Sequence, residues 1–313
     1  MILALAGGVG GAKLAAGLAM QLSPDNLLIV VNTGDDFTHL GLRISPDLDT
    51  VMYWLAGKND VDRGWGIAGE TWNFMDALDR LGGPTWFKLG DRDLATHIER
   101  TRRLSAGENL SAVTRYLCTR LGIEHSIAPM TDDEVRTIIR SDVGTLEFQQ
   151  YFVARRCEPR VLGVEFHGAA LARPSIALRE ALDSRDVSAI IICPSNPLLS
   201  IEPILHVGDV RRRISQYRAP VVAVSPIVGG KALKGPAAKI LLEMGLQPTA
   251  FEVVRLYGDL IDGIVIDSCD TALTEQIESL GVHVMVTDTI MKNRNDRRRL
   301  AQSVIEFALA ISK

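Results

Sequence analysis

Residues 1–20 have the sequence MILALAGGVGGAKLAAGLAM, and this stretch decides the fold. Its apolar start predicts a buried strand, and its Ala- and Leu-rich end predicts a helix. Four glycines lie between them within five residues. Glycines let backbone N–H groups approach an anion, and a helix N-terminus adds about half a positive charge. The stretch therefore predicts a phosphate-binding loop formed by Gly8, Gly10, Gly11 and Lys13.

This glycine loop departs from two common phosphate-binding patterns. Lys13 is followed by Leu14, so the hydroxyl that binds magnesium in a Walker A loop is absent. Gly8 and Gly10 fit G-x-G-x-x-G, but Lys13 stands where the third glycine is expected. A plain tight turn is the alternative, although such a turn rarely needs four glycines.

Composition indicates an ordinary globular enzyme. The chain has 313 residues, of which 47% are hydrophobic and 23% charged. A net charge of −4 gives no argument for binding to nucleic acid or to a membrane surface, so any anion site is local. The chain lacks an apolar run of about 18 residues, a basic leader and a C-x-x-C pair. We expect a cytoplasmic protein with reduced thiols.

A pair of acids follows the second predicted strand. Residues 26–32 read as that strand, which completes a parallel βαβ unit and runs into Asp35 and Asp36. Ligands of open α/β sheets lie beyond the C-terminal ends of the strands, so these acids should face the glycine loop. Acids beside a phosphate site favour Mg²⁺ that bridges carboxylate and phosphate. A ribose-binding acid and a solvated Asx turn are the alternatives.

Two further candidates follow in the first third of the chain. Ser45 and Pro46 predict the start of a helix whose first turn carries Asp47 and Asp49. Acids there compensate the helix dipole, but the position after the acid loop also lets Asp49 reach the same crevice. Lys88 lies among aromatic residues, where it could bind an anion or a ring oxygen. All four tryptophans lie in this third, which suits a flat ligand as well as core packing.

The middle of the chain reads as an insertion. Capping-box patterns start at Ser105 and Thr131, and residues 94–140 have helical spacing. The arginines between 100 and 120 indicate a solvated face. The pattern becomes extended from 145 to 166. We expect residues 94–169 to form a mainly helical lid, and residues 1–93 with 170–313 to form a Rossmann-like core.

The second half predicts the rest of a parallel sheet with helices on both faces. Apolar strands at 189–193, 220–224, 263–266 and 282–286 precede a C-terminal helix at 296–311. Ser195 and Asn196 follow the first of these strands and suit a base or a ribose. Gly230, Lys231 and Lys234 suggest a second anion-binding segment, with a solvated loop as the alternative.

Together these loops resemble those of the CofD family, the 2-phospho-L-lactate transferases of deazaflavin coenzyme F-420 biosynthesis. The resemblance covers most of the chain, and its motifs come in the same order as in the family. It is carried by Gly7-Gly8-Val9-Gly10-Gly11-Ala12-Lys13, Asn32-Thr33-Gly34-Asp35-Asp36, Ile44-Ser45-Pro46-Asp47-Leu48-Asp49-Thr50-Val51, Arg63-Gly64-Trp65-Gly66, Leu89-Gly90-Asp91-Arg92-Asp93, Pro194-Ser195-Asn196-Pro197 and Ser225-Pro226-Ile227-Val228-Gly229-Gly230-Lys231.

The resemblance implies a Rossmann-like homodimer that moves a phosphorylated three-carbon acid from its guanosine diphosphate conjugate to the deazaflavin Fo. GMP leaves, and Mg²⁺ assists. By resemblance, Asp49 and Lys88 hold Fo, the glycine loop and the Ser195–Asn196 loop hold the nucleotide, and Asp35 and Asp36 carry the metal. We expect Lys13 to spread the developing charge and Asp49 to take or orient the hydroxyl proton.

Two other functions compete with this transferase. The YvcK-like proteins share a similar glycine loop and fold and bind nucleotide sugars without known transfer chemistry. Asp49, Lys88 and the Trp-rich segment argue against that reading because a deazaflavin site needs them. An NAD-type oxidoreductase is the weaker alternative, because the third glycine is missing. The sequence does not distinguish phospholactate from phosphoenolpyruvate or phosphoglycerate as the acid.

Overall fold

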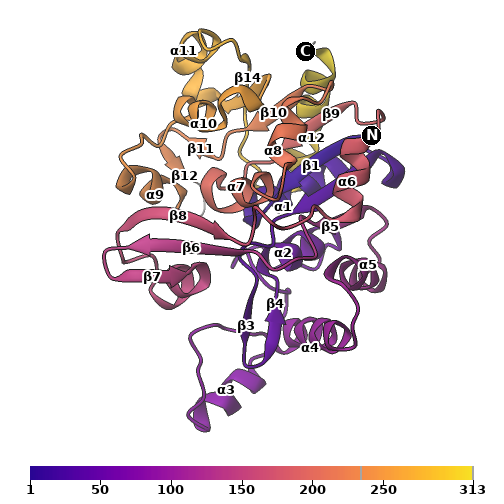
Figure 1. The fold of residues 1–313 in the computed structure, drawn as a ribbon, viewed down its shortest axis with the longest axis vertical. Helices are drawn as coiled ribbons and strands as arrows, with labels where there is room; N and C mark the ends of the chain where they lie inside the picture. The colour runs from indigo at the N-terminus through magenta and orange to yellow at the C-terminus, as the bar shows by residue number, and fades with distance from the viewer. Residues whose placement is uncertain (233–234, 312–313) are drawn as a thin grey trace.

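The computed structural model describes residues 1–232 and 235–311, and a seven-stranded sheet lies at its centre (Figure 1). Every neighbouring pair of strands in this sheet is parallel. The strands lie in the order β14 (His283–Thr287), β13 (Gly263–Asp267), β10 (Val221–Val224), β9 (Ala189–Ile192), β1 (Ile2–Ala6), β2 (Leu27–Val31) and β5 (Ser126–Pro129).

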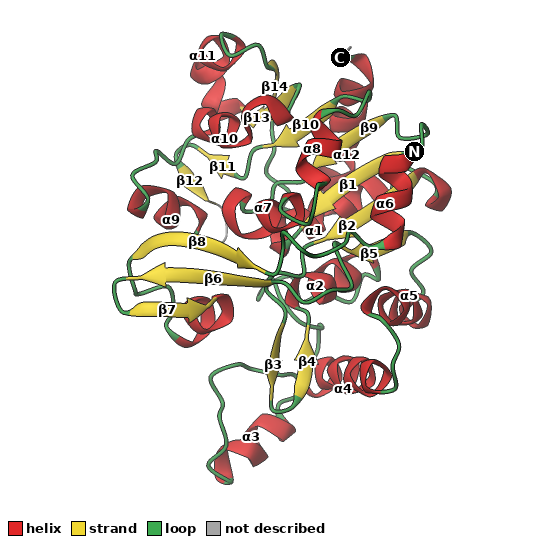
Figure 2. Cartoon of the chain, in the orientation of Figure 1, coloured by secondary structure: helices red, strands yellow, loops and turns green. Residues whose placement is uncertain are grey.

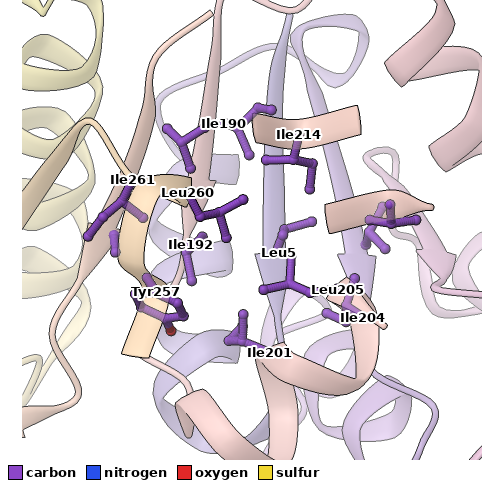
Figure 3. Close-up of a cluster of buried hydrophobic side chains, with 14 of the residues drawn as sticks. Leu5, Ile190, Ile192, Ile201, Ile204, Leu205, Ile214, Tyr257, Leu260 and Ile261 are labelled. Atoms are coloured by element: carbon purple, nitrogen blue, oxygen red, sulfur yellow. The ribbon is translucent and has the colours of Figure 1, made fainter. Parts of the chain in front are cut away.

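Helices cover both faces of this sheet, as predicted. The strands are apolar on both sides, so Leu5 and Ile192 enter one core while Ala4 and Ile191 enter the other. Figure 3 shows part of the first core, in which Leu5 and Ile192 face Ile201 and Tyr257. That face is covered by α6 (Ile176–Asp183), α7 (Glu202–Leu205), α8 (Val210–Ser215), α10 (Ala250–Tyr257) and α11 (Thr274–Glu278). The other is covered by α1 (Gly8–Ala19), α2 (Pro46–Leu55), α5 (Leu110–Leu121) and α12 (Arg294–Ala310).

The strand order places a switch point between β1 and β9. The chain runs from β1 outward through β2 to β5 on one side, and from β9 outward through β10 to β14 on the other. Loops that leave β1 and β9 therefore turn away from each other and leave a crevice at their C-terminal ends. The glycine loop and the Ser195–Asn196 loop begin at this crevice.

Two peripheral parts project from the sheet (Figure 2). One holds the hairpin β3 (Phe37–His39) and β4 (Leu42–Ile44), together with α3 (Asn73–Arg80) and α4 (Asp91–Ser105). Phe37, Ile44, Met75 and Leu89 give it a small apolar cluster of its own. The other is an antiparallel sheet in the order β7 (Gly144–Glu147), β6 (Arg136–Ser141) and β8 (Val161–His167). Beside it lie β11 (Ile227–Val228), β12 (Lys231–Ala232) and α9 (Ala237–Glu243).

The helical prediction for residues 94–140 is wrong beyond α5, which ends at Leu121, because residues 126–129 form strand β5 of the central sheet. Residues 136–141 form strand β6, whose β-branched run pairs with strands on both sides. No helix begins at Thr131, where the hydroxyl accepts the Asp133 N–H and donates to the Arg173 carbonyl. Ser105 ends α4 instead of capping the next helix, whose N-cap is Asn109.

Residues 94–169 also contribute to the central sheet, because β5 pairs with β2. The division into a core and an inserted lid stays a prediction. Within residues 1–232 and 235–311, no helix has both the length and the apolar character needed to cross a bilayer.

Candidate active site

A cavity of about 890 Å³ opens at the C-terminal ends of β1, β2 and β9, where the strand order reverses. Loops from both halves of the sheet line it, together with the loop before α4 and the segment around Phe148. Most of the residues singled out from sequence share this one cavity, namely Gly8, Gly10, Lys13, Asp35, Asp49, Lys88, Ser195 and Asn196.

The glycine loop packs tightly against the loop that follows β9. The Gly7 N–H donates to Ser195 Oγ at 3.0 Å. A Cβ at Gly10 would lie 2.2 Å from the Pro194 carbonyl oxygen, and one at Gly11 would lie 2.4 Å from Ser195 Oγ. Gly10 and Gly11 are therefore needed for the close approach of two loops, and Gly11 itself is buried behind the cavity wall.

Lys13 lies in the first turns of α1 and lines the cavity. Its ammonium donates to the Met291 carbonyl at 2.9 Å and lies 5.7 Å from the centre of the Trp54 ring. This contact joins α1 to the loop after β14, so the charge stays at the cavity wall.

Asp35 and Asp47 bring two buried carboxylates together beside the glycine loop. Asp47 accepts the Gly8 N–H at 2.8 Å through Oδ1 and the Asn32 amide at 3.0 Å through Oδ2. Asp35 Oδ1 is buried and has no hydrogen-bond partner within the described residues. Burial, followed by the charge of Asp47, raises the pKa of Asp35 well above its ordinary value. Burial likewise raises the pKa of Asp47.

These two acids fit a divalent cation. Like charges in a buried site repel, and an unpartnered carboxylate oxygen lacks the donor that burial demands. A hard cation bound between them would relieve both defects, because Mg²⁺ prefers oxygen ligands. Asp36, the other acid that the sequence suggested for the metal, lies beside the cavity without lining it. Its carboxylate accepts the Ser45 hydroxyl at 2.6 Å.

Asp49 lies on α2 at the cavity wall and is held by a buried arginine of α4. Arg100 donates from Nη1 to Asp49 Oδ2 at 3.0 Å and from Nη2 to Asp49 Oδ1, which makes a two-pronged ion pair. The Arg100 side chain is only 1% exposed. The prediction that this arginine belongs to a solvated face is therefore wrong.

Three ligand atoms from Asp49, Asp93 and His97 lie within 4.8 Å of one another, which is a spacing that could hold a metal ion. Their charges already have partners in the protein, however. Arg100 bonds both oxygens of Asp49, and the Tyr53 hydroxyl donates to Asp93 at 2.6 Å. We interpret the cluster as an internal polar network.

Aromatic side chains line the outer part of the cavity. Trp65, Trp86 and Phe87 belong to this wall together with the exposed Lys88. Opposite segments add Phe148 and Phe152, whose rings stack with centroids 5.4 Å apart and planes 9° apart. The other two tryptophans do not line the cavity: Trp54 is buried against Lys13, and Trp72 packs edge-on to Trp65. Two of the four tryptophans that cluster in the sequence therefore belong to the cavity wall, and two do not.

The second glycine segment lines this cavity only in part. Gly230 and Lys231 are exposed at the turn between β11 and β12, and neither lines the cavity, although Val228 and Ala232 do. Lys234 lies outside the described residues. Sequence reasoning passed over the buried network of Asp93, His97 and Arg100, as well as the stacked phenylalanines. The signal for the network was the i, i+4, i+7 spacing along one helix.

Comparison with known proteins gives one consistent result. A family model described as 2-phospho-L-lactate transferase CofD matches residues 2–306. A Streptomyces griseus protein named phosphoenolpyruvate transferase is 40% identical over 314 residues, covering 98% of each chain. A Methanosarcina mazei protein named 2-phospho-L-lactate transferase is 38% identical over 300 residues, covering 96% of this chain and 98% of that one.

One solved structure shows the likeness of fold. A UPF0052-family protein from Bacillus halodurans aligns with a TM-score of 0.63 at 12% identity, covering 97% of this chain and 98% of that chain. At this identity the match supports the α/β architecture and nothing further.

Proposed function

The chain belongs to the CofD family and is a transferase, and from this premise we propose its substrates and the roles of its residues. The donor is the guanosine diphosphate conjugate of a phosphorylated three-carbon acid, and the acceptor is the deazaflavin Fo. The observation that carries the proposal is that an anion loop, paired acids and an aromatic wall share one cavity. A deazaflavin and a guanylylated acid need those three surfaces side by side.

The donor diphosphate lies at the glycine loop. The N-terminus of α1 attracts anions, and Lys13 adds a positive charge at the same wall. Ser195 and Asn196 lie across the switch point, where a ribose or base can reach them. Gly230 and Lys231 take no part in this site because they lie outside the cavity lining.

Mg²⁺ is held by Asp35, with Asp47 as its second carboxylate. Asp35 and Asp47 both line the cavity whereas Asp36 does not, which supports this choice over Asp36, and the unpartnered Oδ1 of Asp35 supports a cation at that acid. When bound there, the cation neutralises charge on the diphosphate. The proposal refines the metal pair of Asp35 and Asp36 expected from sequence.

The acceptor ring lies against the aromatic wall, with Lys88 and Asp49 near its ribityl chain. Stacking suits a flat tricycle, and the carboxylate of Asp49 can accept a hydrogen bond from the terminal hydroxyl. That hydroxyl oxygen attacks the phosphorus next to the acid, and the bond from this phosphorus to the oxygen of GMP breaks. GMP keeps the electron pair, and the hydroxyl proton passes to water. Catalysis then rests on positioning and charge neutralisation.

The test is an assay of the purified chain with Fo, Mg²⁺ and each of three guanylylated acids: phospholactate, phosphoenolpyruvate and phosphoglycerate. We expect mass spectrometry to detect the matching Fo adduct with at least one donor. Relatives named for two of these acids match at 40% and 38% identity, so all three are run in parallel. Binding of nucleotide with no adduct from any donor would contradict the proposal and favour a regulatory binding protein.

The quaternary state is proposed on the family resemblance, and the location on the scattered cysteines of the sequence. We infer a homodimer in the cytoplasm. Light scattering coupled to size exclusion tests the first, and an apparent mass equal to that of a single chain would rule out the dimer.

A further inference from the structure

Helix α4 presents three charged or titratable residues on one buried face. Asp93, His97 and Arg100 follow the i, i+4, i+7 spacing, so they lie in a row along the helix. All three are buried, with 1% exposure for Arg100 and 2% for His97. Burial of such groups is unfavourable unless each finds a partner. Asp93 and Arg100 make hydrogen bonds, His97 lies between them, and the row of contacts ends at Asp49 on the cavity wall.

The contacts along this row form a continuous chain from Tyr53 to Asp49. Tyr53 donates to Asp93 Oδ1 at 2.6 Å, and His97 Nε2 lies 3.3 Å from Asp93 Oδ2. His97 Nδ1 lies 3.2 Å from Arg100 Nη1, which donates to Asp49 Oδ2. His97 Nδ1 can accept the Arg100 N–H, whereas His97 Nε2 lies near Asp93 Oδ2 without the geometry of a hydrogen bond. The imidazole then fixes the plane of the guanidinium, and the guanidinium fixes the carboxylate.

Helix α4 also follows closely after Lys88, the other residue proposed for the acceptor site. Helix α4 begins at Asp91, three residues after Lys88. Its first N–H groups are fixed by Glu70, which accepts from Arg92 at 2.8 Å and from Asp93 at 2.9 Å. Helix α4 therefore fixes both the end of the loop that carries Lys88 and the orientation of Asp49.

We propose that Arg100, held by His97 and Asp93, is the positioning residue of the acceptor site and keeps Asp49 as a fixed hydrogen-bond acceptor. This inference rests on the proposed function, since it concerns the hydroxyl of Fo. Asp49 orients that hydroxyl while the attacking oxygen bonds to phosphorus, GMP departs with the electron pair, and the proton goes to water. Asp49 is thus an orienting group, whereas the sequence left open whether it takes the proton.

A double-mutant cycle tests this role. The variants are Arg100→Met, Asp49→Asn and the pair, compared by kcat/KM for Fo at saturating donor. We expect each single change to lower kcat/KM by about 100-fold, as the loss of a positioned contact does. The double variant should stay within about threefold of Asp49→Asn, because Arg100 acts only through Asp49. Affinity for GDP, measured by calorimetry, should stay within about twofold of wild type in all three, because the donor side is untouched.

Two further variants separate positioning from simple support of the fold. Arg100→Lys keeps the charge but can bond only one carboxylate oxygen, so it should lower kcat/KM for Fo by about tenfold. Arg102→Met removes an arginine of the same helix whose side chain is 61% exposed, and it should match wild type. If Arg100→Met does not fold, Arg100→Lys and the double variant, from which Asp49 and its partner are removed together, still decide the question.

Failure of this inference and failure of the proposed function would give different experimental results. Losses that multiply in the double variant, or wild-type kcat/KM for Fo in Arg100→Lys, would overturn the inference and leave the transferase function standing. Absence of any Fo adduct from the wild-type chain would overturn the proposed function, and this inference with it.

Discussion

Ser195 Oγ accepts the N–H of Gly7 at 3.0 Å, and this bond joins the two halves of the parallel sheet at their switch point. The two residues are separated by 188 positions in the sequence. Their contact brings the glycine loop of the first half against the Pro194–Asn196 loop of the second. The donor site proposed here depends on that junction, so changes at it should affect nucleotide binding first.

Gly10→Ala should weaken GDP binding by at least about tenfold. The new Cβ would meet the Pro194 carbonyl oxygen at 2.2 Å, so the two loops must separate. Gly17→Ala is the matched control, because Gly17 lies on the same helix as Gly10 but away from the cavity. Its new Cβ would meet the Arg297 carbonyl oxygen of α12 at 2.4 Å. Both variants should lose thermal stability, and calorimetry with GDP should separate them. Equal GDP affinity in the two would contradict the role given to the junction.

Asp35→Asn should abolish the dependence of the transfer rate on added Mg²⁺ and lower the rate itself by about 100-fold or more. The reason is that Asp35 supplies the unpartnered carboxylate oxygen beside the diphosphate. Asp25→Asn serves as the control, since it changes an acid that does not line the cavity. A magnesium titration of the initial rate measures both, and an unchanged titration curve in Asp35→Asn would remove Asp35 from the metal site.

Asp36 should make the metal-free protein less stable as pH rises from about 4 to about 7. Burial raises the pKa of its carboxyl from 3.8 to about 7. An acid with a raised pKa in the folded state contributes its full stability below the unfolded pKa and loses it as pH rises through the folded value. Asp36→Asn should flatten this part of the curve. Chemical unfolding at several pH values, with a chelator present, measures it, and equal slopes for both proteins would contradict the prediction.

Lys88→Met should raise the KM for Fo by about 10- to 100-fold and leave GDP affinity within about twofold, because Lys88 lines the aromatic part of the cavity. Lys58→Met changes another exposed lysine outside the cavity lining and is the control. Titration of Fo fluorescence gives the acceptor affinity directly. A KM for Fo equal to that of the control would exclude Lys88 from the acceptor site.

The sequence predicted every strand of the parallel sheet except β5, because the other strands are continuous apolar runs, and strand order then brought Gly10, Asp35 and Ser195 to one edge. It failed at residues 134–140, since the acids at 132–134 mimic a capping box while pairing with β8, distant in sequence, decides the conformation. Arg100 was also missed. Four charged residues lie between positions 99 and 103, and only the tertiary contacts of α4, in which Arg100 bonds Asp49 of α2 and the Arg43 carbonyl of β4, select which one is buried.

The measurement that bears most directly on the central claim is the release of GMP from the guanylylated acid with and without Fo. If donor and acceptor share the cavity, wild-type protein should release GMP only when Fo is present, with one GMP for each Fo adduct formed. Asp49→Asn should release it about 100-fold more slowly. GMP released at the same rate with or without Fo, or more GMP than adduct, would contradict the account.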